Sequence, residues 1–211
     1  MSNRPISGLY AITPEEHDTA ELLREVCLAL QGGANVLQYR NKHGDAALRL
    51  AQAEALRALT REFAVALIIN DNAALAHAVD ADGVHLGGED GSIAAARALL
   101  GSGKIIGVSC YNRAELAHQA VLEGADYVAF GAFFASTVKP EARVATVQML
   151  RQARSEIAVP IVAIGGITPD NGDELLQAGA DALAVISAVF ATDDVAGAAK
   201  RFSILFSKAK Q

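Results

Sequence analysis

VLQYRNK, at residues 36–42, predicts a short β-strand that ends in polar side chains. Residues two apart on a strand share a face, so Gln38, Arg40 and Lys42 are expected on one side and the apolar residues between them on the other. A cationic row at the end of a buried strand is costly unless an anion meets it. The stretch therefore predicts the carboxyl end of a buried strand beside an anion-binding site.

The same unit, a short apolar run followed by an amphipathic stretch, recurs along the chain. Eight strands are predicted, at Gly8–Ile12, Val36–Tyr39, Ala66–Asn70, Gly83–Leu86, Ile105–Ser109, Tyr127–Gly131, Ile161–Ile164 and Ala182–Ile186. Helices are predicted at Asp18–Gln31, Asp45–Phe63, Ser92–Leu100, Arg113–Glu123, Val144–Ile157 and Asn171–Ala178. Gly32-Gly33, Gly124 and Gly179 are expected to end helices, and Thr13-Pro14 and Thr168-Pro169 to open them.

Strands that alternate with helices pair in parallel through βαβ crossovers. Eight such units in 211 residues, without a linker, predict one α/β domain over residues 1–211, a (β/α)8 TIM barrel. A doubly wound open sheet is the alternative fold. That fold usually carries a glycine-rich turn after its first strand, but here the strand ends in Ile12-Thr13-Pro14 and GxGxxG is absent.

Composition narrows the range of partners. The net charge of −6, without a basic stripe, argues against nucleic acid. No apolar segment is long enough to cross a membrane, no signal-peptide pattern is present, and Cys27 and Cys110 have no CxxC spacing. We therefore expect a cytoplasmic protein that binds small molecules and no membrane. The oligomeric state stays open, a homo-oligomer included.

Active sites of such barrels lie at the carboxyl ends of the strands, where this chain gathers its polar residues. The candidates are Gln38, Arg40, Lys42, Asn70, Asp71, Asp90, Ser109, Ser136, Thr137, Lys139 and Ser187. Each has a structural alternative: Asn70, Asp71 or Asp90 as a helix cap, Ser109 as a strand-end partner, Lys139 as a solvated loop lysine. Their convergence at one rim favours a site.

Asp71 and Asp90 follow neighbouring strands and are expected to reach one Mg²⁺ ion. Arg40, Lys42 and Lys139 would surround the phosphates of a ligand, and this much positive charge suits a diphosphate.

A second anion site is expected at Gly165-Gly166 and Ser187, after the last two strands. His85 lies within a strand and is interpreted as a hydrogen-bonded core residue rather than a catalyst.

These residues resemble the thiamine-phosphate synthase family. The matching segments run from the first strand to the last: Leu9–Thr13, Gln38–Lys42, Ile69–Asn72, Gly83–Asp90, Ile106–Ser109, Gly124–Val128 and Ile164–Ile167. The QxRxK row, the Asn-Asp pair and the GVHLGxxD run are together specific, whereas the Gly-Gly and Gly-Ala-Asp pieces occur in many phosphate-binding barrels.

The resemblance implies an enzyme that joins hydroxymethylpyrimidine diphosphate to a thiazole phosphate and releases pyrophosphate, with Mg²⁺ on Asp71 and Asp90. Residues implied to hold the pyrimidine diphosphate are Gln38, Arg40, Lys42, Asn70, Ser109 and Lys139. Those implied around the thiazole phosphate are Ser136, Thr137, Val138, Gly166, Ile186 and Ser187. Arg40, Lys42, Ser109 and Lys139 are the predicted catalytic residues. The resemblance also suggests that pyrophosphate leaves before the thiazole nitrogen attacks.

The chain departs from the family pattern before Lys139, where Thr-x-Thr-Lys becomes Ser136-Thr137-Val138-Lys139. Val138 removes one hydroxyl that would contact a phosphate. Two alternative functions remain on the same barrel. A thiazole tautomerase-like isomerase would carry a Gly-His pair where this chain has Gly131-Ala132. A non-catalytic phosphate-binding barrel would leave the two carboxylates without a purpose.

Overall fold

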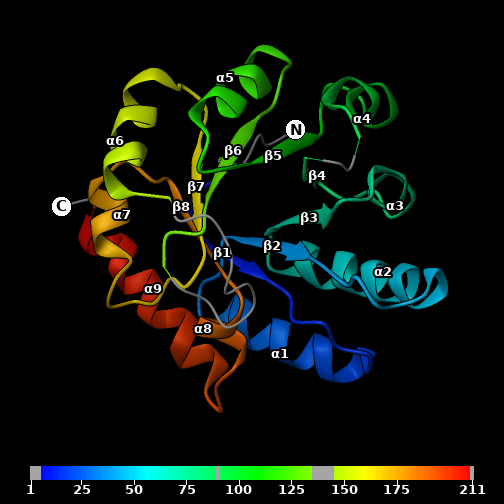
Figure 1. Ribbon diagram of the computed structural model, residues 1–211. Coiled ribbons are helices and arrows are strands. Elements are labelled where there is room, and N and C mark those ends of the chain that lie inside the picture. The colour runs from blue at the N-terminus through cyan, green and yellow to red at the C-terminus, as the bar shows by residue number, and fades with distance from the viewer. Residues whose placement is uncertain (1–5, 89–90, 135–144, 210–211) are drawn as a thin grey trace.

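Eight parallel strands close into a barrel in the computed structural model, which describes residues 6–88, 91–134 and 145–209 (Figure 1). Each strand pairs with its neighbours in sequence, and β8 pairs with β1. The strands are β1 Gly8–Ile12, β2 Val36–Tyr39, β3 Ala66–Asn70, β4 Gly83–Leu86, β5 Ile105–Tyr111, β6 Tyr127–Gly131, β7 Ile161–Ile164 and β8 Ala182–Val185. The predicted TIM barrel is confirmed. Only the carboxyl ends of β5 and β8 differ from the predicted strands.

Helices surround the barrel on its outer side (Figure 1). They are α1 Thr19–Gln31, α2 Ala46–Glu62, α3 Ala73–Ala78, α4 Ile93–Leu100, α5 Ala114–Leu122, α6 Val147–Glu156, α7 Asp173–Gln177, α8 Ser187–Phe190 and α9 Val195–Ala209. Helices α3, α8 and α9 lie outside the predicted ranges. Helix α3 has six residues, too few for a helical period to stand out.

The expected helix starts at the two Thr-Pro pairs are wrong. Helix α1 begins only at Thr19, where the Asp18 carboxylate accepts hydrogen bonds from the first-turn amides. Thr13 instead ties two strand ends together: its hydroxyl oxygen accepts from the Arg40 amide at 3.0 Å. The expected glycine stops are confirmed, since Gly33, Gly124 and Gly179 all have φ between +93° and +102°.

Two apolar cores hold the barrel together. The larger lies between the strands and the helices. The smaller fills the barrel interior and consists of Ile6, Tyr10, Ile12, Val36, Ile68, Tyr127, Ala129, Val162, Ala182 and Ala184. Tyr10 and Tyr127 are its largest fully buried side chains, and they meet across the lumen with their hydroxyl oxygens 2.8 Å apart. The barrel is thus a packed core whose middle contains phenol groups, and these require hydrogen-bond partners.

One device recurs at the amino-terminal end of the barrel. An aspartate that precedes a strand accepts a hydrogen bond from the first or second amide of the strand before it and pairs with an arginine of a helix. Asp82 accepts from the Leu67 amide at 2.8 Å and from Arg57 of α2 at 2.6 Å. Asp126 and Asp181 bind in the same way to Ile106 and Arg97, and to Ile161 and Arg154. This face therefore serves stability and lies opposite the strands' carboxyl ends.

We expect Asp82→Ala to lower the free energy of unfolding by about 1–3 kcal/mol, because it leaves the Leu67 amide without its partner. Asp82→Asn is the matched control, since it keeps an acceptor oxygen and should lose less. Urea titration of both variants measures the difference. Equal stability of Asp82→Ala and the wild type would contradict the role assigned to this carboxylate.

Candidate active site

The alternation predicted for β2 is confirmed at Gln38 and Tyr39. Gln38 points into the lumen, where its amide nitrogen donates to the Tyr10 oxygen at 2.9 Å. Tyr39 points outward, and its hydroxyl donates to Gln52 of α2 at 2.8 Å. The predicted row of Gln38, Arg40 and Lys42 on one face is wrong for the two cations, because the strand ends at Tyr39 and its alternation does not extend to them.

Arg40 turns toward the loop that follows β1. Its guanidinium donates to Glu15 Oε1 at 2.7 Å, and both side chains are mostly buried. The ring of His43 lies 3.0 Å from the other oxygen of Glu15. Sequence reasoning missed Glu15. Glu15 lies between the first predicted strand and the first predicted helix, where it carries no local signal, and only the barrel closure brings it to Arg40.

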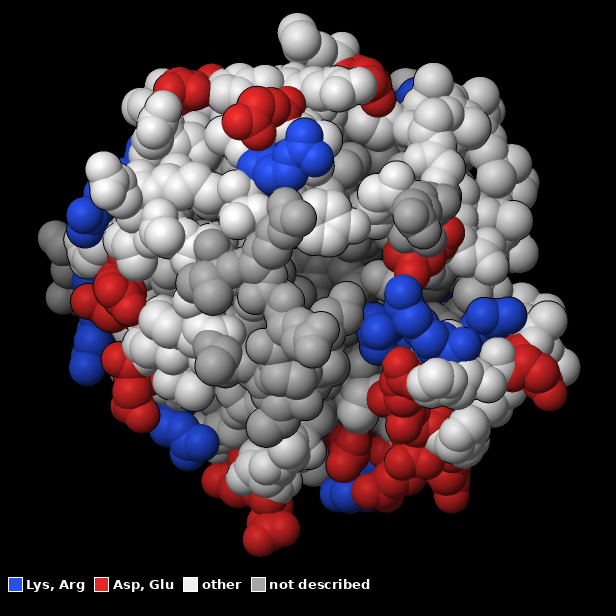
Figure 2. All heavy atoms as spheres, viewed as in Figure 1, with Lys and Arg blue, Asp and Glu red and all other residues white. Residues whose placement is uncertain are grey.

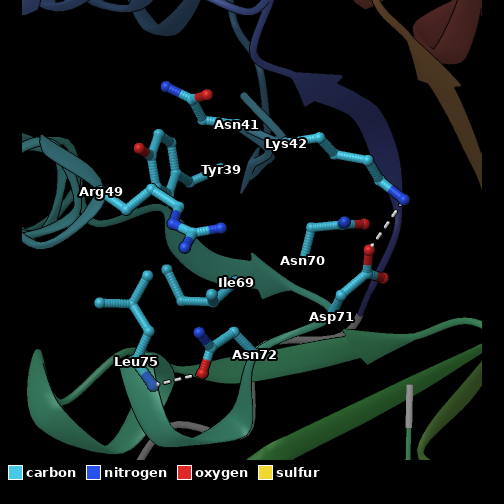
Figure 3. A pocket seen from close by; sticks show the side chains of 9 residues that line it. All are labelled: Tyr39, Asn41, Lys42, Arg49, Ile69, Asn70, Asp71, Asn72 and Leu75. Atoms are coloured by element: carbon cyan, nitrogen blue, oxygen red, sulfur yellow. Dashed lines mark hydrogen bonds and ion pairs between the residues drawn. The ribbon is translucent and has the colours of Figure 1, made fainter. Parts of the chain in front are cut away.

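Lys42 turns the other way, toward β3. Its ammonium group lies 3.1 Å from Asp71 Oδ2, and the Lys42 side chain is half exposed (Figure 3). A cation from the segment after β2 and a predicted metal ligand directly after β3 therefore meet at the mouth. Figure 2 shows Lys and Arg atoms against Asp and Glu atoms on this side of the molecule, beside β2.

The helix-cap alternatives for Asn70 and Asp71 are wrong. Asn72 caps α3 instead, with its side-chain oxygen 2.9 Å from the Leu75 amide. Asp71 has φ +60°, a left-handed conformation that costs about 1–2 kcal/mol for most residues and less for Asp or Asn. Its amide donates to the His85 carbonyl at 2.8 Å. The backbone thus turns away from the strand here and leaves the carboxylate at the mouth.

A cavity of about 320 Å³ opens beside this pair, between β2, β3 and the helices that follow them (Figure 3). Lys42 and Arg49 contribute positive charge to its walls, and Asn70 and Asn72 contribute amides. Asp71 contributes the carboxylate. Among the described residues no group of three potential metal ligands is present. Asp71 is the one predicted Mg²⁺ ligand within the described residues, because Asp90 lies outside them.

A chain of hydrogen bonds occupies the lumen beneath the mouth. From Gln38 and Tyr10 it continues through Tyr127 to Nδ1 of His85 at 2.9 Å, and from Nε2 of His85 to the Ser109 hydroxyl at 2.8 Å. Burial lowers the pKa of His85 to about 4, against the smaller opposing effect of the Asp71 charge, so the imidazole is neutral at physiological pH. Burial also raises the pKa of Tyr10 and of Tyr127. The interpretation of His85 as a hydrogen-bonded core residue is confirmed.

The residues predicted for a second anion site lie at the ends of two neighbouring strands. Gly165 and Gly166 follow β7 with φ of +103° and +62°, and a Cβ on Gly165 would lie 2.4 Å from that of Ala132. Ile186 and Ser187 follow β8, where Ser187 begins the short helix α8. Because β7 and β8 are paired, these backbones share one side of the mouth.

Five predicted site residues lie outside the described residues: Asp90, Ser136, Thr137, Val138 and Lys139. Their approach to Arg40 and Asp71 stays a prediction. The described part of the chain does show that Ser92 caps α4, with its hydroxyl oxygen 3.1 Å from the Ala95 amide. The cap of this helix therefore needs no contribution from Asp90.

Comparison with known proteins gives a consistent result. The family model described as thiamine monophosphate synthase matches residues 9–189. Thiamine-phosphate synthase of Methylobacillus flagellatus is 55% identical, with 96% of this chain and 97% of that protein covered, and the enzyme of Nitrosospira multiformis is 52% identical, with 97% and 88% covered. The solved structure of thiamine phosphate pyrophosphorylase from Pyrococcus furiosus matches with a TM-score of 0.90 at 36% identity, over 100% of both chains.

The conformation of Asp71 leads to a prediction about stability. Asp71→Asn should change the free energy of unfolding by less than about 1 kcal/mol, because asparagine tolerates a left-handed backbone and the lost ion pair is with a half-exposed lysine. Asp71→Val should cost about 1–2 kcal/mol more, because a β-branched residue is strained there. Thermal and urea unfolding of the two variants measure this difference. Equal stability would contradict the described backbone.

Proposed function

This chain belongs to the thiamine monophosphate synthase family, and we propose that its barrel mouth binds the two substrates of that synthesis together with Mg²⁺. The reaction joins 4-amino-2-methyl-5-(diphosphooxymethyl)pyrimidine to 4-methyl-5-(2-phosphooxyethyl)thiazole and gives thiamine monophosphate and pyrophosphate. The observation that carries the proposal is the meeting of Lys42 and Asp71 at 3.1 Å, at the mouth of a barrel whose relatives are thiamine-phosphate synthases.

The diphosphate fits the β2–β3 side of the mouth. Lys42 and Arg40 flank this region from opposite sides. Asn70 is the last residue of β3, the strand between β2 and β4, and it brings its side-chain amide to the same region. The half-exposed Lys42 can exchange its contact with Asp71 for a phosphate oxygen at small cost, since exposed ion pairs contribute about 0–1 kcal/mol. Lys139 is proposed to complete the set of cations.

Asp71 and Asp90 are the proposed Mg²⁺ ligands. The fit to Asp71 rests on its donor chemistry: a hard carboxylate oxygen, held at the mouth by the backbone turn and paired with one half-exposed lysine. Mg²⁺ commonly takes one or two carboxylates and completes its coordination with water and substrate phosphate. When bound, the ion would neutralise negative charge on the pyrophosphate leaving group.

The proposed chemistry breaks the bond between the pyrimidine methylene carbon and the diphosphate oxygen. The bonding electron pair leaves with pyrophosphate, whose charge Arg40, Lys42 and Lys139 stabilise. The thiazole nitrogen then donates its lone pair to the methylene carbon and forms the new C–N bond. The Ser109 hydroxyl, beside the lumen, is proposed to contact the pyrimidine substrate during this step.

The thiazole phosphate is assigned to the opposite side of the mouth. Gly166, Ile186 and Ser187 lie together after β7 and β8, and Ser136, Thr137 and Val138 are proposed to approach them. This region and the cationic side would hold the thiazole phosphate and the pyrimidine diphosphate apart. Such an arrangement suits a transfer between two phosphorylated partners.

A cytoplasmic location and the absence of nucleic-acid partners remain proposals, supported by the net charge of −6 and by two free cysteines. None of the helices in the described ranges has the length and apolar character needed to cross a membrane.

Pyrophosphate release, measured with both substrates and with or without Mg²⁺, tests the function. Lys42→Ala and Asp71→Ala should each lower kcat by about 10²–10³-fold, since each removes charge that acts on the leaving group or on its ion. Lys200→Ala, on the exposed side of α9, is the control and should leave kcat unchanged.

Near-normal kcat in both site variants at saturating substrate would contradict the assigned roles. Tautomerisation of a thiazole without pyrophosphate release would support the isomerase alternative, and phosphate binding without turnover would support a non-catalytic barrel.

A further inference from the structure

The hydrogen-bond chain in the lumen joins two predicted substrate ligands through three residues to which the reaction gives no role. Gln38 on β2 and Ser109 on β5 are its ends, and Tyr10, Tyr127 and His85 lie between them. The three inner side chains and Gln38 are at most 8% exposed. The ring planes of His85 and Tyr127 are stacked with centroids 5.6 Å apart, so the middle of the chain is also fixed by packing.

Hydrogen counting gives the chain a direction. The Gln38 amide nitrogen donates to the Tyr10 oxygen, so Tyr10 has one hydrogen left to give to Tyr127. Tyr127 in turn donates to Nδ1 of His85, and the proton on Nε2 is then donated to Ser109. Reversal of any single link leaves a buried O–H or N–H without an acceptor, which is costly.

A second arrangement in which every hydrogen has an acceptor arises only when donor and acceptor exchange in all four hydrogen bonds. That arrangement requires the Gln38 amide to turn its oxygen toward Tyr10. The two arrangements present opposite groups to a ligand. In the first, Gln38 keeps its oxygen as a free acceptor and the Ser109 hydroxyl is a free donor. In the second, Gln38 offers only N–H groups and Ser109 only lone pairs. The state of one end therefore fixes the state of the other.

The depth of these groups indicates which part of a substrate they meet. Gln38 and His85 are uncharged and buried in the lumen, whereas Lys42 and Asp71 lie at the mouth and are more exposed. A substrate with a charged tail and an uncharged ring would place the diphosphate at the mouth and the ring against the chain's two ends.

We propose that Tyr10, Tyr127 and His85 are positioning residues that couple the Gln38 amide to the Ser109 hydroxyl, so that the site selects a ring presenting a hydrogen-bond donor to Gln38 and an acceptor to Ser109. An aminopyrimidine has both, in its exocyclic amine and its ring nitrogen. The 4-oxo analogue exchanges donor and acceptor and would be rejected. The identity of the ring rests on the proposed function, whereas the coupling rests on the hydrogen bonds alone.

Nitrogen-15 NMR of histidine-labelled full-length chain tests the coupling without substrate. His85 should carry its proton on Nε2 in the wild type. Gln38→Glu, studied at pH 9 so that the introduced carboxyl group is ionised, should move the proton to Nδ1, because a carboxylate accepts from Tyr10 and reverses every link. In a Tyr127→Phe background the same change should leave the His85 tautomer unaffected.

The signal of His85 is assigned from a His85→Gln sample or, if that variant does not fold, by elimination with variants of the four unburied histidines. A wild-type proton on Nδ1, or a tautomer that does not respond to Gln38→Glu, would overturn the coupling.

Steady-state kinetics test the selection. The wild type should prefer the amino substrate to the 4-oxo analogue by at least about 100-fold in kcat/KM, since a site built to hydrogen-bond rejects the mismatched analogue strongly. Tyr127→Phe should lose at least about tenfold of this preference and leave the KM for thiazole phosphate unchanged. Tyr10→Phe repeats the test if Tyr127→Phe does not fold.

Thr60→Val is the control, because Thr60 is fully buried on α2 and its hydroxyl donates to its own helix at 3.2 Å. It should keep the full preference. An unchanged preference in both tyrosine variants would overturn the selection. Absence of pyrophosphate release from the wild type, together with the expected NMR result, would refute the proposed function and leave the coupling intact.

Discussion

Closure of eight parallel strands is the constraint on which the rest of this structure depends. Parallel strands place all their carboxyl ends on one rim, so residues from distant parts of the sequence become neighbours there. Lys42 and Asp71 are an example, as they lie 29 residues apart and meet at 3.1 Å. The opposite rim has a different role, because Asp82, Asp126 and Asp181 all bind amides and arginines of the scaffold. Stability and chemistry are thereby separated to the two ends of the barrel.

Closure also creates a lumen, which has to be filled. Apolar side chains fill most of it, but Tyr10, Tyr127 and His85 bring polar atoms into a region without access to bulk water. Such atoms are tolerated only when they are paired with one another. Their pairing ends at Gln38 and Ser109, the two members that are proposed to contact the substrate. If these two residues bind substrate as proposed, the interior packing and the substrate site are physically continuous, and a change in the core has a route to the reaction.

The sequence predicted the fold almost completely and the site only in part. Strand positions followed from apolar runs and from glycine stops, which are local signals. The rim residues followed from the rule that active sites of such barrels lie at the carboxyl ends of the strands. Contacts across the barrel had no such signal. Tyr10 and Tyr127 occupy apolar strands 117 residues apart, and the bond between their hydroxyls exists only after closure. Glu15 was missed for the same reason. The prediction at Thr13-Pro14 failed because the Thr13 hydroxyl bonds to the backbone of Arg40 at a strand end and does not cap a helix.

The two cations after β2 differ in a way that bears on how a diphosphate enters. Arg40 and Glu15 are about four-fifths and three-quarters buried, so their contact is weakly screened and holds the guanidinium in one orientation. Lys42 is half exposed, and its contact with Asp71 is of the kind that contributes little to stability. A guanidinium has donors beyond those bound to one carboxylate, so Arg40 can meet a phosphate without leaving Glu15. Lys42 has a single ammonium group on a flexible stem, and in the proposed complex it would meet the phosphate by moving away from Asp71. In the proposed function the mouth therefore combines one cation held in place by Glu15, which would set geometry, with one half-exposed cation, whose movement would uncover the Asp71 carboxylate as the substrate arrives.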